Sequence, residues 1–375
     1  MTVIEVAIGP GDTVGSFRVE VLRSPAGEAC TTVELDVRQL LAHREQLEAV
    51  VLTSAVTNRS ALAQAERQVR EVGRTLFSAL LGTGEVAGRY RASAALAAQR
   101  EEALRVVLRI DTPALASLPW EAMYDTGAGG YVCRRDQLVR HVPVASVPTP
   151  LTVRPPLRIL SVVSSPAGLP KMDVKKERGQ LRQALSKLQA EGLVDVRWAS
   201  ESTWAGLQDL LLGEKWHVMH FIGHGHFDAM LDEGTLALVG DDGSADWIDA
   251  ERLVDLLRQA RPMPRLVVLN SCSGAVTGTD DLFSGTAAAL VRGGISAVVA
   301  MQFPISDTAA IAFARGFYAA IARGRGVDSA TSSGRVAIIG TSAKTLEWLT
   351  PVIYLRGHES RLFRSMTKPS FVGVL

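Results

Sequence analysis

Histidines gather in one short stretch of this chain. The whole sequence has only seven histidines, and "HVMHFIGHGHF" (217–227) contains four of them, His217, His220, His224 and His226. Clustered imidazoles can bind a metal, relay protons or lie where a strand ends. Cys272 comes 48 positions after His224, just behind the apolar run "RLVVLN". A nearby imidazole can take the proton of a thiol and later return it to a leaving amine. His224 and Cys272 are therefore candidate partners in nucleophilic catalysis.

Glycines flank both candidates. Gly223 and Gly225 surround His224, and Gly274 follows Cys272 in "CSG". Such glycines allow tight turns and a close approach of the backbone to a substrate. The amides of Gly225 and Cys272 could then form an oxyanion hole. A lone cysteine at the end of an apolar strand is usually a small core residue, so the hypothesis depends on the pairing with His224.

The other histidines have simpler interpretations, and a metal site is the main alternative. A zinc ion could be bound by the set His220, His224, His226 and Cys272, because imidazole and thiolate suit zinc. Their spacing fits no standard structural zinc site, and no Cys-x-x-Cys pair supports one. We therefore expect no metal and no cofactor. His220 is predicted to be a hydrogen-bonded core group, His217 to be half exposed, and His226 to line the cleft.

Alternating strands and helices are predicted to position these residues. Apolar runs at "LRILSVVSS" (157–165), "WHVMHFIGHG" (216–225), "PRLVVLNSC" (264–272) and "ISAVVAMQF" (295–303) are separated by helical patterns. Repeated units of this kind indicate a mostly parallel sheet with helices on both faces. Binding and catalytic sites of such sheets usually lie at the carboxyl ends of the strands, and His224 and Cys272 are both predicted to lie there.

The region before residue 155 has a different pattern. Residues 17–36 read as two strands and a turn, residues 37–100 as mostly helical with a break near 81–88, and residues 103–111 as a buried strand. The proline-rich segment 146–158 is a linker candidate and indicates a domain boundary near residue 155. We expect an accessory lobe (1–155), a catalytic domain (156–356) and a tail (357–375).

Composition excludes several classes of protein. The chain is 47% hydrophobic and 21% charged with a net charge of +1, so no overall field favours nucleic acid or a membrane as a partner. Its three cysteines, Cys30, Cys133 and Cys272, are odd in number and far apart, which argues against a disulfide framework. The N-terminus does not resemble a signal peptide, and no apolar run is long enough to span a membrane. We expect a cytoplasmic protein.

Several motifs together make the sequence resemble the CHAT domain family. Members of this family are caspase-like cysteine peptidases related to caspases, separases and gingipains. The motifs are "LPWEAMYD" (118–125), "RPPLRILSVVSSPAGLP" (154–170), "HFIGHG" (220–225), "LVVLNSCSGA" (266–275), "GTAAALVRGGISAVVAMQFPISD" (285–307), "FARGFY" (313–318) and "WLTPVIYLR" (348–356). The resemblance implies a caspase-like α/β fold, preceded by an accessory lobe that is itself pseudo-protease-like. It also implies that His224 is the base and Cys272 the nucleophile.

The same resemblance implies where a substrate would bind. In caspase-like folds the residue two positions before the nucleophile points into the pocket for the P1 side chain, and here it is Asn270. A neutral amide cannot neutralise a buried guanidinium, so strict basic specificity would need another acid in the pocket. Asp307 is a candidate, although Ser306 or Asp307 could equally be a helix N-cap. Gln302 and Phe303 are predicted to be walls of the substrate groove, where a peptide could also add as a strand.

The sequence thus predicts a cysteine endopeptidase that cleaves a protein or peptide partner. Similar bacterial enzymes often act in defence or programmed death, and an upstream sensor or activator could bind the N-terminal lobe. Two alternatives stay open at this point. One is a non-catalytic pseudo-protease that only binds partners, and the other is a thiol hydrolase acting on a non-peptide acyl group.

Overall fold

The computed structural model describes residues 1–54, 59–110, 112–144, 149–228, 233–270, 284–342 and 345–365. The helices are α1 (Val37–Ala42), α2 (Arg44–Thr53), α3 (Arg59–Leu81), α4 (Gly84–Gln99), α5 (Pro113–Ala116), η1 (Trp120–Ala122), α6 (Val132–Arg135), α7 (Val174–Ala190), α8 (Trp204–Gly213), α9 (Ala250–Leu257), α10 (Ser284–Gly293), α11 (Asp307–Ala322), α12 (Val327–Ile339) and η2 (Glu347–Leu349). The strands are β1 (Val3–Pro10), β2 (Ser16–Arg23), β3 (Ala29–Glu34), β4 (Arg105–Ile110), β5 (Tyr124–Asp125), β6 (Gly130–Tyr131), β7 (Gln137–Val142), β8 (Leu151–Val153), β9 (Leu157–Val163), β10 (Val194–Trp198), β11 (Val218–Ile222), β12 (Gly225–Asp228), β13 (Glu233–Val239), β14 (Ala245–Asp249), β15 (Leu266–Asn270), β16 (Ala297–Met301), β17 (Pro351–Arg356) and β18 (Phe363–Ser365).

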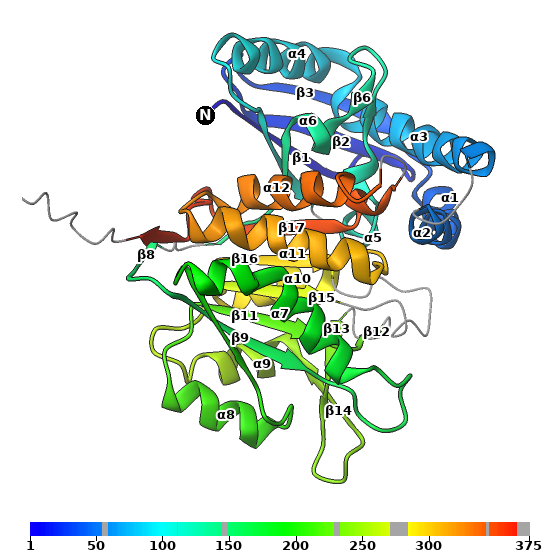
Figure 1. Ribbon diagram of the computed structural model, residues 1–375. Coiled ribbons are helices and arrows are strands. Elements are labelled where there is room, and N and C mark those ends of the chain that lie inside the picture. The colour runs from blue at the N-terminus through cyan, green and yellow to red at the C-terminus, as the bar shows by residue number, and fades with distance from the viewer. Residues whose placement is uncertain are drawn as a thin grey trace, which may run out of the picture.

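One large sheet organises the molecule. Its eleven strands follow the order β10-β9-β11-β15-β16-β17-β7-β4-β1-β2-β3 (Figure 1). The strands β10, β9, β11, β15 and β16 are mutually parallel, and β17 runs antiparallel to β16. The strands β17, β7, β4 and β1 are again parallel to one another. The carboxyl ends of β11 and β15 therefore lie at the opposite end of the sheet from those of β7 and β4.

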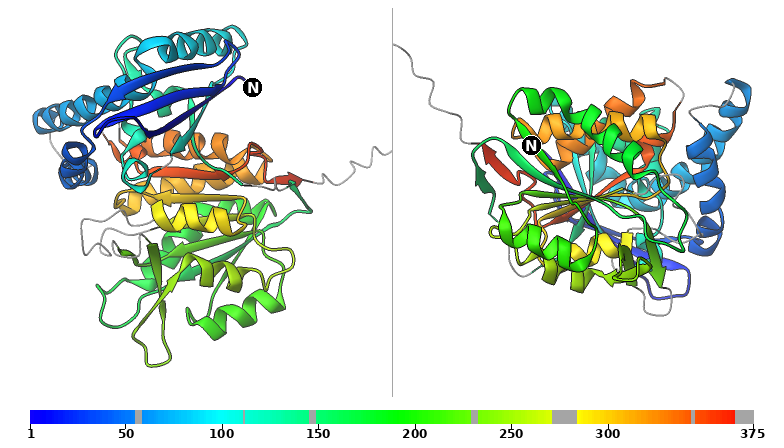
Figure 2. Two further views of the ribbon diagram at one scale, coloured as in Figure 1. Left: turned by 180° about the vertical axis from the view of Figure 1, so that it is seen from behind. Right: turned by 60° about the horizontal axis from the view of Figure 1, so that its bottom comes forward.

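Helices cover both faces of the part of the sheet that holds β9, β11, β15 and β16. Helices α7, α11 and α12 lie on one face, and α8, α9 and α10 lie on the other (Figure 2, right). Apolar side chains of each group belong to the buried cluster on its own face. Strands β11, β15 and β16 are buried at every position, because neither face of them meets water. This explains why their sequences are continuous apolar runs.

Local sequence signals set the ends of the helices around the site. Asp173, Thr203, Asp249 and Ser306 are N-caps, and each side chain accepts a hydrogen bond from the backbone three residues later. Such caps satisfy amides that have no partner within the helix. A hairpin around Asp242-Gly243 joins β13 and β14, with Gly243 at a φ of 82°. A positive φ is the reason for a glycine in this turn.

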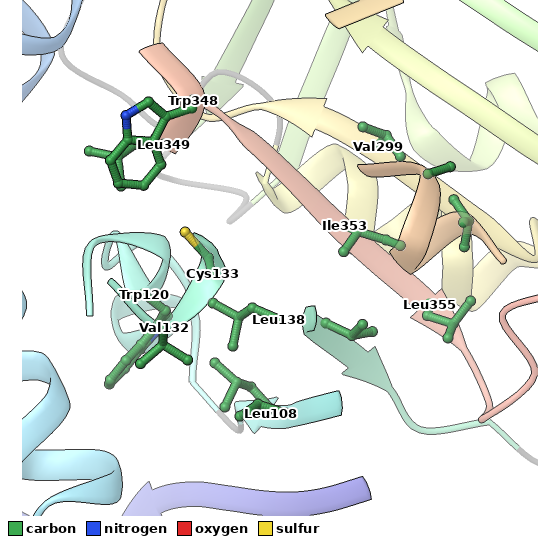
Figure 3. Packing of buried hydrophobic residues seen from close by; sticks show 14 of the residues in the cluster. Leu108, Trp120, Val132, Cys133, Leu138, Val299, Trp348, Leu349, Ile353 and Leu355 are labelled. Carbon is green, nitrogen blue, oxygen red and sulfur yellow. The ribbon is translucent and has the colours of Figure 1, made fainter. Parts of the chain in front are cut away.

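The sheet continues across the predicted domain boundary near residue 155. Strand β17 pairs with β7, so elements from the two sides of the proline-rich segment share backbone hydrogen bonds. Figure 3 shows Leu108 and Leu138 from one side close to Ile353 and Leu355 from the other, all in one buried cluster. Both parts share a core, and a division into two lobes near this point stays a prediction.

A buried polar network also joins the two parts. Arg140 of β7 and Glu121 of η1 are 2% and 1% exposed and form an ion pair with an N···O distance of 2.6 Å. The amide nitrogen of Gln302, just beyond β16, donates to Glu121 (3.1 Å) and to the carbonyl of Leu349 (2.8 Å). Buried charges are stable only when paired in this way. The motif "LPWEAMYD" thus has a structural role, because its glutamate links η1 to the ends of β7 and β16.

Part of the tail is anchored beside the proline-rich segment. Strand β18 pairs in parallel with β8, and the amide of Leu151 donates to the carbonyl of Leu362 at 2.8 Å. Residues 366–375 lie outside the described residues. Among the described helices, none has the length and apolar character that crossing a membrane requires.

Candidate active site

The candidate site lies where β11 and β15 end side by side. The two strands pair in parallel from Val218 opposite Leu266 to Ile222 opposite Asn270. The amide of Gly223 donates to the carbonyl of Asn270 at 3.2 Å, which ties the turn before His224 to the end of β15. A Cβ atom at Gly223 would lie 2.6 Å from the ring of Phe221, so this turn requires a glycine.

His224 is buried and its ring has no hydrogen-bond partner among the described residues. The residue is 2% exposed, and both Nδ1 and Nε2 are without a partner. Burial lowers the pKa of His224, and the backbone carbonyl of Pro170 lies near enough to the ring to oppose that shift, although it makes no hydrogen bond of normal length with either nitrogen. The imidazole is therefore neutral near pH 7 and keeps a lone pair that can accept a proton. Its backbone carbonyl accepts a hydrogen bond from Ala237 at 3.1 Å, which fixes the turn against β13.

Cys272, the predicted nucleophile, lies outside the described residues, as does Gly274. Asn270 is the last described residue before it, and it ends β15. Gly225 is the first residue of β12 and pairs with Leu236 of β13. The roles of Cys272 as nucleophile, and of the Gly225 and Cys272 amides as an oxyanion hole, stay predictions.

The remaining histidines occupy three different environments. The Nδ1 atom of His220 lies 2.8 Å from the hydroxyl of Tyr318, and burial lowers the pKa of His220 to about 4. His217 accepts a hydrogen bond from the amide of Arg158 at 2.9 Å, and burial lowers its pKa to about 4 as well. His226 is exposed beside Trp247, with 5.7 Å between the ring centroids. His220 is thus a hydrogen-bonded core residue, as the sequence predicts.

In the ranges that the structure describes, no three His, Cys, Asp or Glu side chains lie together in a way that could hold a metal ion. His220 is committed to Tyr318 through one ring nitrogen. Cys272 is not among the described residues, so the zinc alternative is tested only for its histidines.

Asn270 borders a narrow pocket between α7, α11 and the sheet. Asn270 is 7% exposed, and its Oδ1 atom is buried with no hydrogen-bond partner within the described ranges. The pocket is lined by Glu177, Gln180, Leu181, His220, Ile222, Asn270, Met301, Ala310, Ile311, Phe313 and Ala314. Its walls are apolar with a few polar groups, which is the usual composition of a ligand pocket.

Glu177 is an acid in this pocket that sequence reasoning missed. Residues 175–183 suggest a solvated helix face, yet Glu177 is only 7% exposed. It lies four residues before Leu181 and eight before Leu185, which are 4% and 0% exposed. Residues at this spacing share one face of a helix, so the apolar stripe of α7 was the signal that could have located Glu177.

Asp307, the acid considered from the sequence, lies at the start of α11. Its carboxylate forms an ion pair with Lys176 of α7 at 2.5 Å, and its side chain is 36% exposed. The N-cap of α11 is Ser306, whose hydroxyl accepts from the amide of Ala309. The open choice between Ser306 and Asp307 as the cap is thus decided in favour of Ser306, and a substrate-binding role for Asp307 stays a prediction.

Gln302 and Phe303 are placed inside the protein and not on an open wall. They are 3% and 2% exposed. The side chain of Gln302 is held by Glu121 and Leu349, and the guanidinium of Arg44 lies 5.8 Å from the centre of the Phe303 ring. Arg44 also donates to the carbonyl of Gln302 at 3.1 Å. These side chains pack between the two parts of the chain, and a substrate-binding role for them stays a prediction.

Comparisons with known proteins agree with the observed architecture. The model of the CHAT domain family matches residues 70–354. A chain of the crystal structure of the Saccharomyces cerevisiae separase–securin complex at 2.6 angstrom resolution is similar, with a TM-score of 0.52 and 11% identity; the similarity covers 97% of this chain and 30% of that one. A second structure of the same complex, at 3.0 angstrom resolution, has a TM-score of 0.49 and 10% identity over 95% of this chain and 30% of that one. No curated protein matches the sequence. At such low identity the likeness shows the fold, and it confirms the predicted caspase-like class.

Proposed function

Because this chain belongs to the CHAT domain family, we propose that it is a cysteine endopeptidase with His224 as base and Cys272 as nucleophile. One observation carries the proposal. His224 is held at the carboxyl end of β11, buried, with both ring nitrogens lacking a partner among the described residues. Strand β15 lies beside it and leads within two residues to Cys272.

The chemistry follows from the neutral state of His224. The imidazole accepts the thiol proton, and the thiolate attacks the scissile carbonyl carbon, which moves the carbonyl electron pair onto oxygen. The amides of Gly225 and Cys272 would stabilise that oxyanion. The imidazolium then donates its proton to the leaving amine, which produces a thioester and the first product. Water, deprotonated by His224, hydrolyses the thioester and restores the thiol.

The competing proposals differ in what they require of His224. A scaffold that only binds partners gains nothing from a buried imidazole that finds no hydrogen-bond partner among the described residues, since an unpaired buried polar group costs about 1–3 kcal/mol. A catalytic base, in contrast, needs a free ring nitrogen, so such a group is expected at an active site in spite of its cost to stability. A thiol hydrolase of a non-peptide acyl group would use the same two residues, and only its substrate separates it from a peptidase.

The wider biological role is also a proposal. We infer a protein substrate and a separate activating partner, because the resemblance to bacterial defence and programmed-death peptidases includes both. The likeness to a chain of a separase–securin complex supports an association with another protein in general terms. A cytoplasmic location is proposed from the few, widely spaced cysteines and the N-terminus unlike a signal peptide.

The test is cleavage of a fluorogenic tetrapeptide library that varies the P1 residue. Wild type, Cys272→Ala and His224→Ala are compared side by side. Cleavage by the wild type alone supports the peptidase. Equal cleavage by all three purified proteins would mean that neither residue is needed for it, and would contradict the proposal. Reaction of the wild type with thioesters or esters, without peptide cleavage, would instead establish the non-peptide hydrolase.

A further inference from the structure

A second concave surface lies on the N-terminal part of the chain, away from the His224 site. It is formed by α3, the short hairpin of β5 and β6, and α6, and encloses about 430 Å³. It is lined by Glu66, Arg70, Tyr124, Ala128, Gly129, Gly130, Tyr131, Arg134 and Arg135. We call it the arginine pocket. Neither the family match nor the proposed peptidase activity assigns it a role.

Two cations beside this pocket have no carboxylate partner among the described residues. Arg74 of α3 is exposed, with its guanidinium 5.7 Å from the centre of the Tyr124 ring. Arg134 of α6 is exposed, with its guanidinium 5.2 Å from the centre of the Trp348 ring. Guanidinium groups stack on aromatic faces in this way and still present their edge N–H donors to a ligand.

The other arginines of the pocket are held in place by acids. Arg70 pairs with Glu66 at 2.7 Å and also lies over Tyr124. Arg135 pairs with Asp136 at 3.0 Å and is 3.5 Å from Asp125. These acids leave Arg134 in the pocket and Arg74 beside it unneutralised, and the lining itself, with three arginines and one glutamate, carries a net positive charge. The arrangement favours an anionic ligand.

A row of aromatic rings connects the two unpaired arginines. Tyr124 and Tyr131 pack edge to face with centroids 5.0 Å apart, and Tyr131 and Trp348 do the same at 4.8 Å. Arg74 contacts the first ring of this row and Arg134 the last. Consecutive rings of the row are about as far apart as one to two residues of an extended peptide, which advances by about 3.3 Å per residue.

A buried hydroxyl supplies the second indication of a ligand. Tyr131 is 4% exposed, and its hydroxyl lies near the guanidinium of Arg70 but has no hydrogen-bond partner of normal length among the described residues. Burial raises the pKa of Tyr131, so the phenol stays protonated and can donate a hydrogen bond. A buried donor without an acceptor is costly, and an acceptor delivered by a ligand would remove that cost.

We propose that the arginine pocket binds an acidic segment of a partner protein, in extended form, with its carboxylates on Arg74 and Arg134. The cations are spread over two elements and separated by rings, which suits a peptide with spaced carboxylates better than a single phosphate group. The chain as a whole has a net charge of +1, which gives no support to nucleic acid as the ligand.

The pocket adjoins elements that lead to the candidate active site. Trp348, beneath Arg134, belongs to η2 together with Glu347. The carboxylate of Glu347 accepts from the amide and the hydroxyl of Ser306, at 2.6 and 3.0 Å. Ser306 caps α11, the helix that lines the pocket containing Asn270. A segment bound on Arg134 would therefore contact an element that is hydrogen-bonded to the start of α11. Binding of the segment does not depend on the proposed peptidase activity.

The test measures binding of a fluorescein-labelled peptide in which Glu alternates with Ser, by fluorescence polarisation with the full chain. A peptide in which Gln replaces Glu is the uncharged control. Arg74→Gln/Arg134→Gln is compared with wild type and with Arg154→Gln, an exposed arginine in the segment before β9. Circular dichroism and thermal melting confirm that the variants fold.

The proposal predicts that wild type and Arg154→Gln bind the Glu peptide alike and the Gln peptide at least tenfold more weakly. Arg74→Gln/Arg134→Gln should weaken the Glu peptide by about 100-fold, since each charge-assisted hydrogen bond is worth roughly a factor of ten. Absence of binding to wild type, or equal binding to the double variant, would overturn it. Competition by inorganic phosphate or by oligothymidine at lower concentration than the Glu peptide would reassign the pocket to another anion and likewise overturn it.

Discussion

Replacement of Glu121 by alanine tests whether the buried network holds the two parts of the chain together. Glu121 accepts hydrogen bonds from Arg140 at 2.6 and 3.3 Å and from Gln302 at 3.1 Å. Its removal takes from the Arg140 guanidinium the buried carboxylate that pairs with it at 2.6 Å, and the loss of one partner costs about 3–5 kcal/mol in comparable buried pairs. Arg140 keeps hydrogen bonds to the carbonyls of Ala116 and Leu118 at 2.5 and 3.2 Å. The expected loss is therefore at the lower end of that range, about 3 kcal/mol.

The assay is unfolding in urea followed by circular dichroism, with the free energy of unfolding extrapolated to water. Asp255→Ala is the matched control, because Asp255 pairs with Arg258 at a similar distance of 2.7 Å but on the surface, with side chains 61% and 54% exposed. An exposed pair contributes about 0–1 kcal/mol. If Glu121→Ala loses no more than Asp255→Ala, the network does not stabilise the junction and the reasoning from burial is wrong.

Three further predictions concern the candidate site. The pKa of His220 is lowered from 6.5 to about 4, so the unfolded state binds more protons than the folded state between these pH values. The free energy of unfolding should therefore fall as the pH drops through that window, and it should fall less steeply in His220→Gln. Denaturant titration at several pH values measures both. Gly223→Ala should reduce peptide cleavage at least tenfold, because the new Cβ would lie 2.6 Å from the Phe221 ring and displace His224. Gly179→Ala is the control and should leave cleavage unchanged, because its Cβ meets nothing within 4 Å. Asn270→Asp should raise the rate on P1-arginine peptides relative to P1-alanine peptides by about tenfold if Asn270 faces the P1 side chain, and an unchanged ratio would remove it from that pocket.

The sequence predicted those features that depend on local pattern. Continuous apolar runs located β9, β11, β15 and β16, since strands buried on both faces need such runs. Asp173 at the start of α7 is a feature of the same local kind, because a side-chain cap leaves a signal within a few residues. The position of His224 at a strand end also followed from its flanking glycines.

Features that depend on contacts far apart in the chain could not be predicted in the same way. The pairing of β17 with β7 joins segments on the two sides of the proline-rich segment, and no local pattern encodes a strand's neighbour. Gln302 looked like a groove residue because its partners, Glu121 and Leu349, come from distant segments. Glu177 was hidden among charged neighbours, although its spacing from Leu181 placed it on the buried face of α7.

The most direct test of the His224/Cys272 pair is the rate of cysteine alkylation at neutral pH, resolved by residue through mass spectrometry of peptides. Cys30 is exposed on the edge strand β3 and reports ordinary thiol reactivity in the same sample. Cys133 is buried, which raises its pKa to about 11, so it should stay unlabelled. The account predicts that Cys272 reacts at least tenfold faster than Cys30 in wild type and loses that advantage in His224→Ala. Equal rates at Cys272 in the two proteins would contradict the pairing of base and nucleophile.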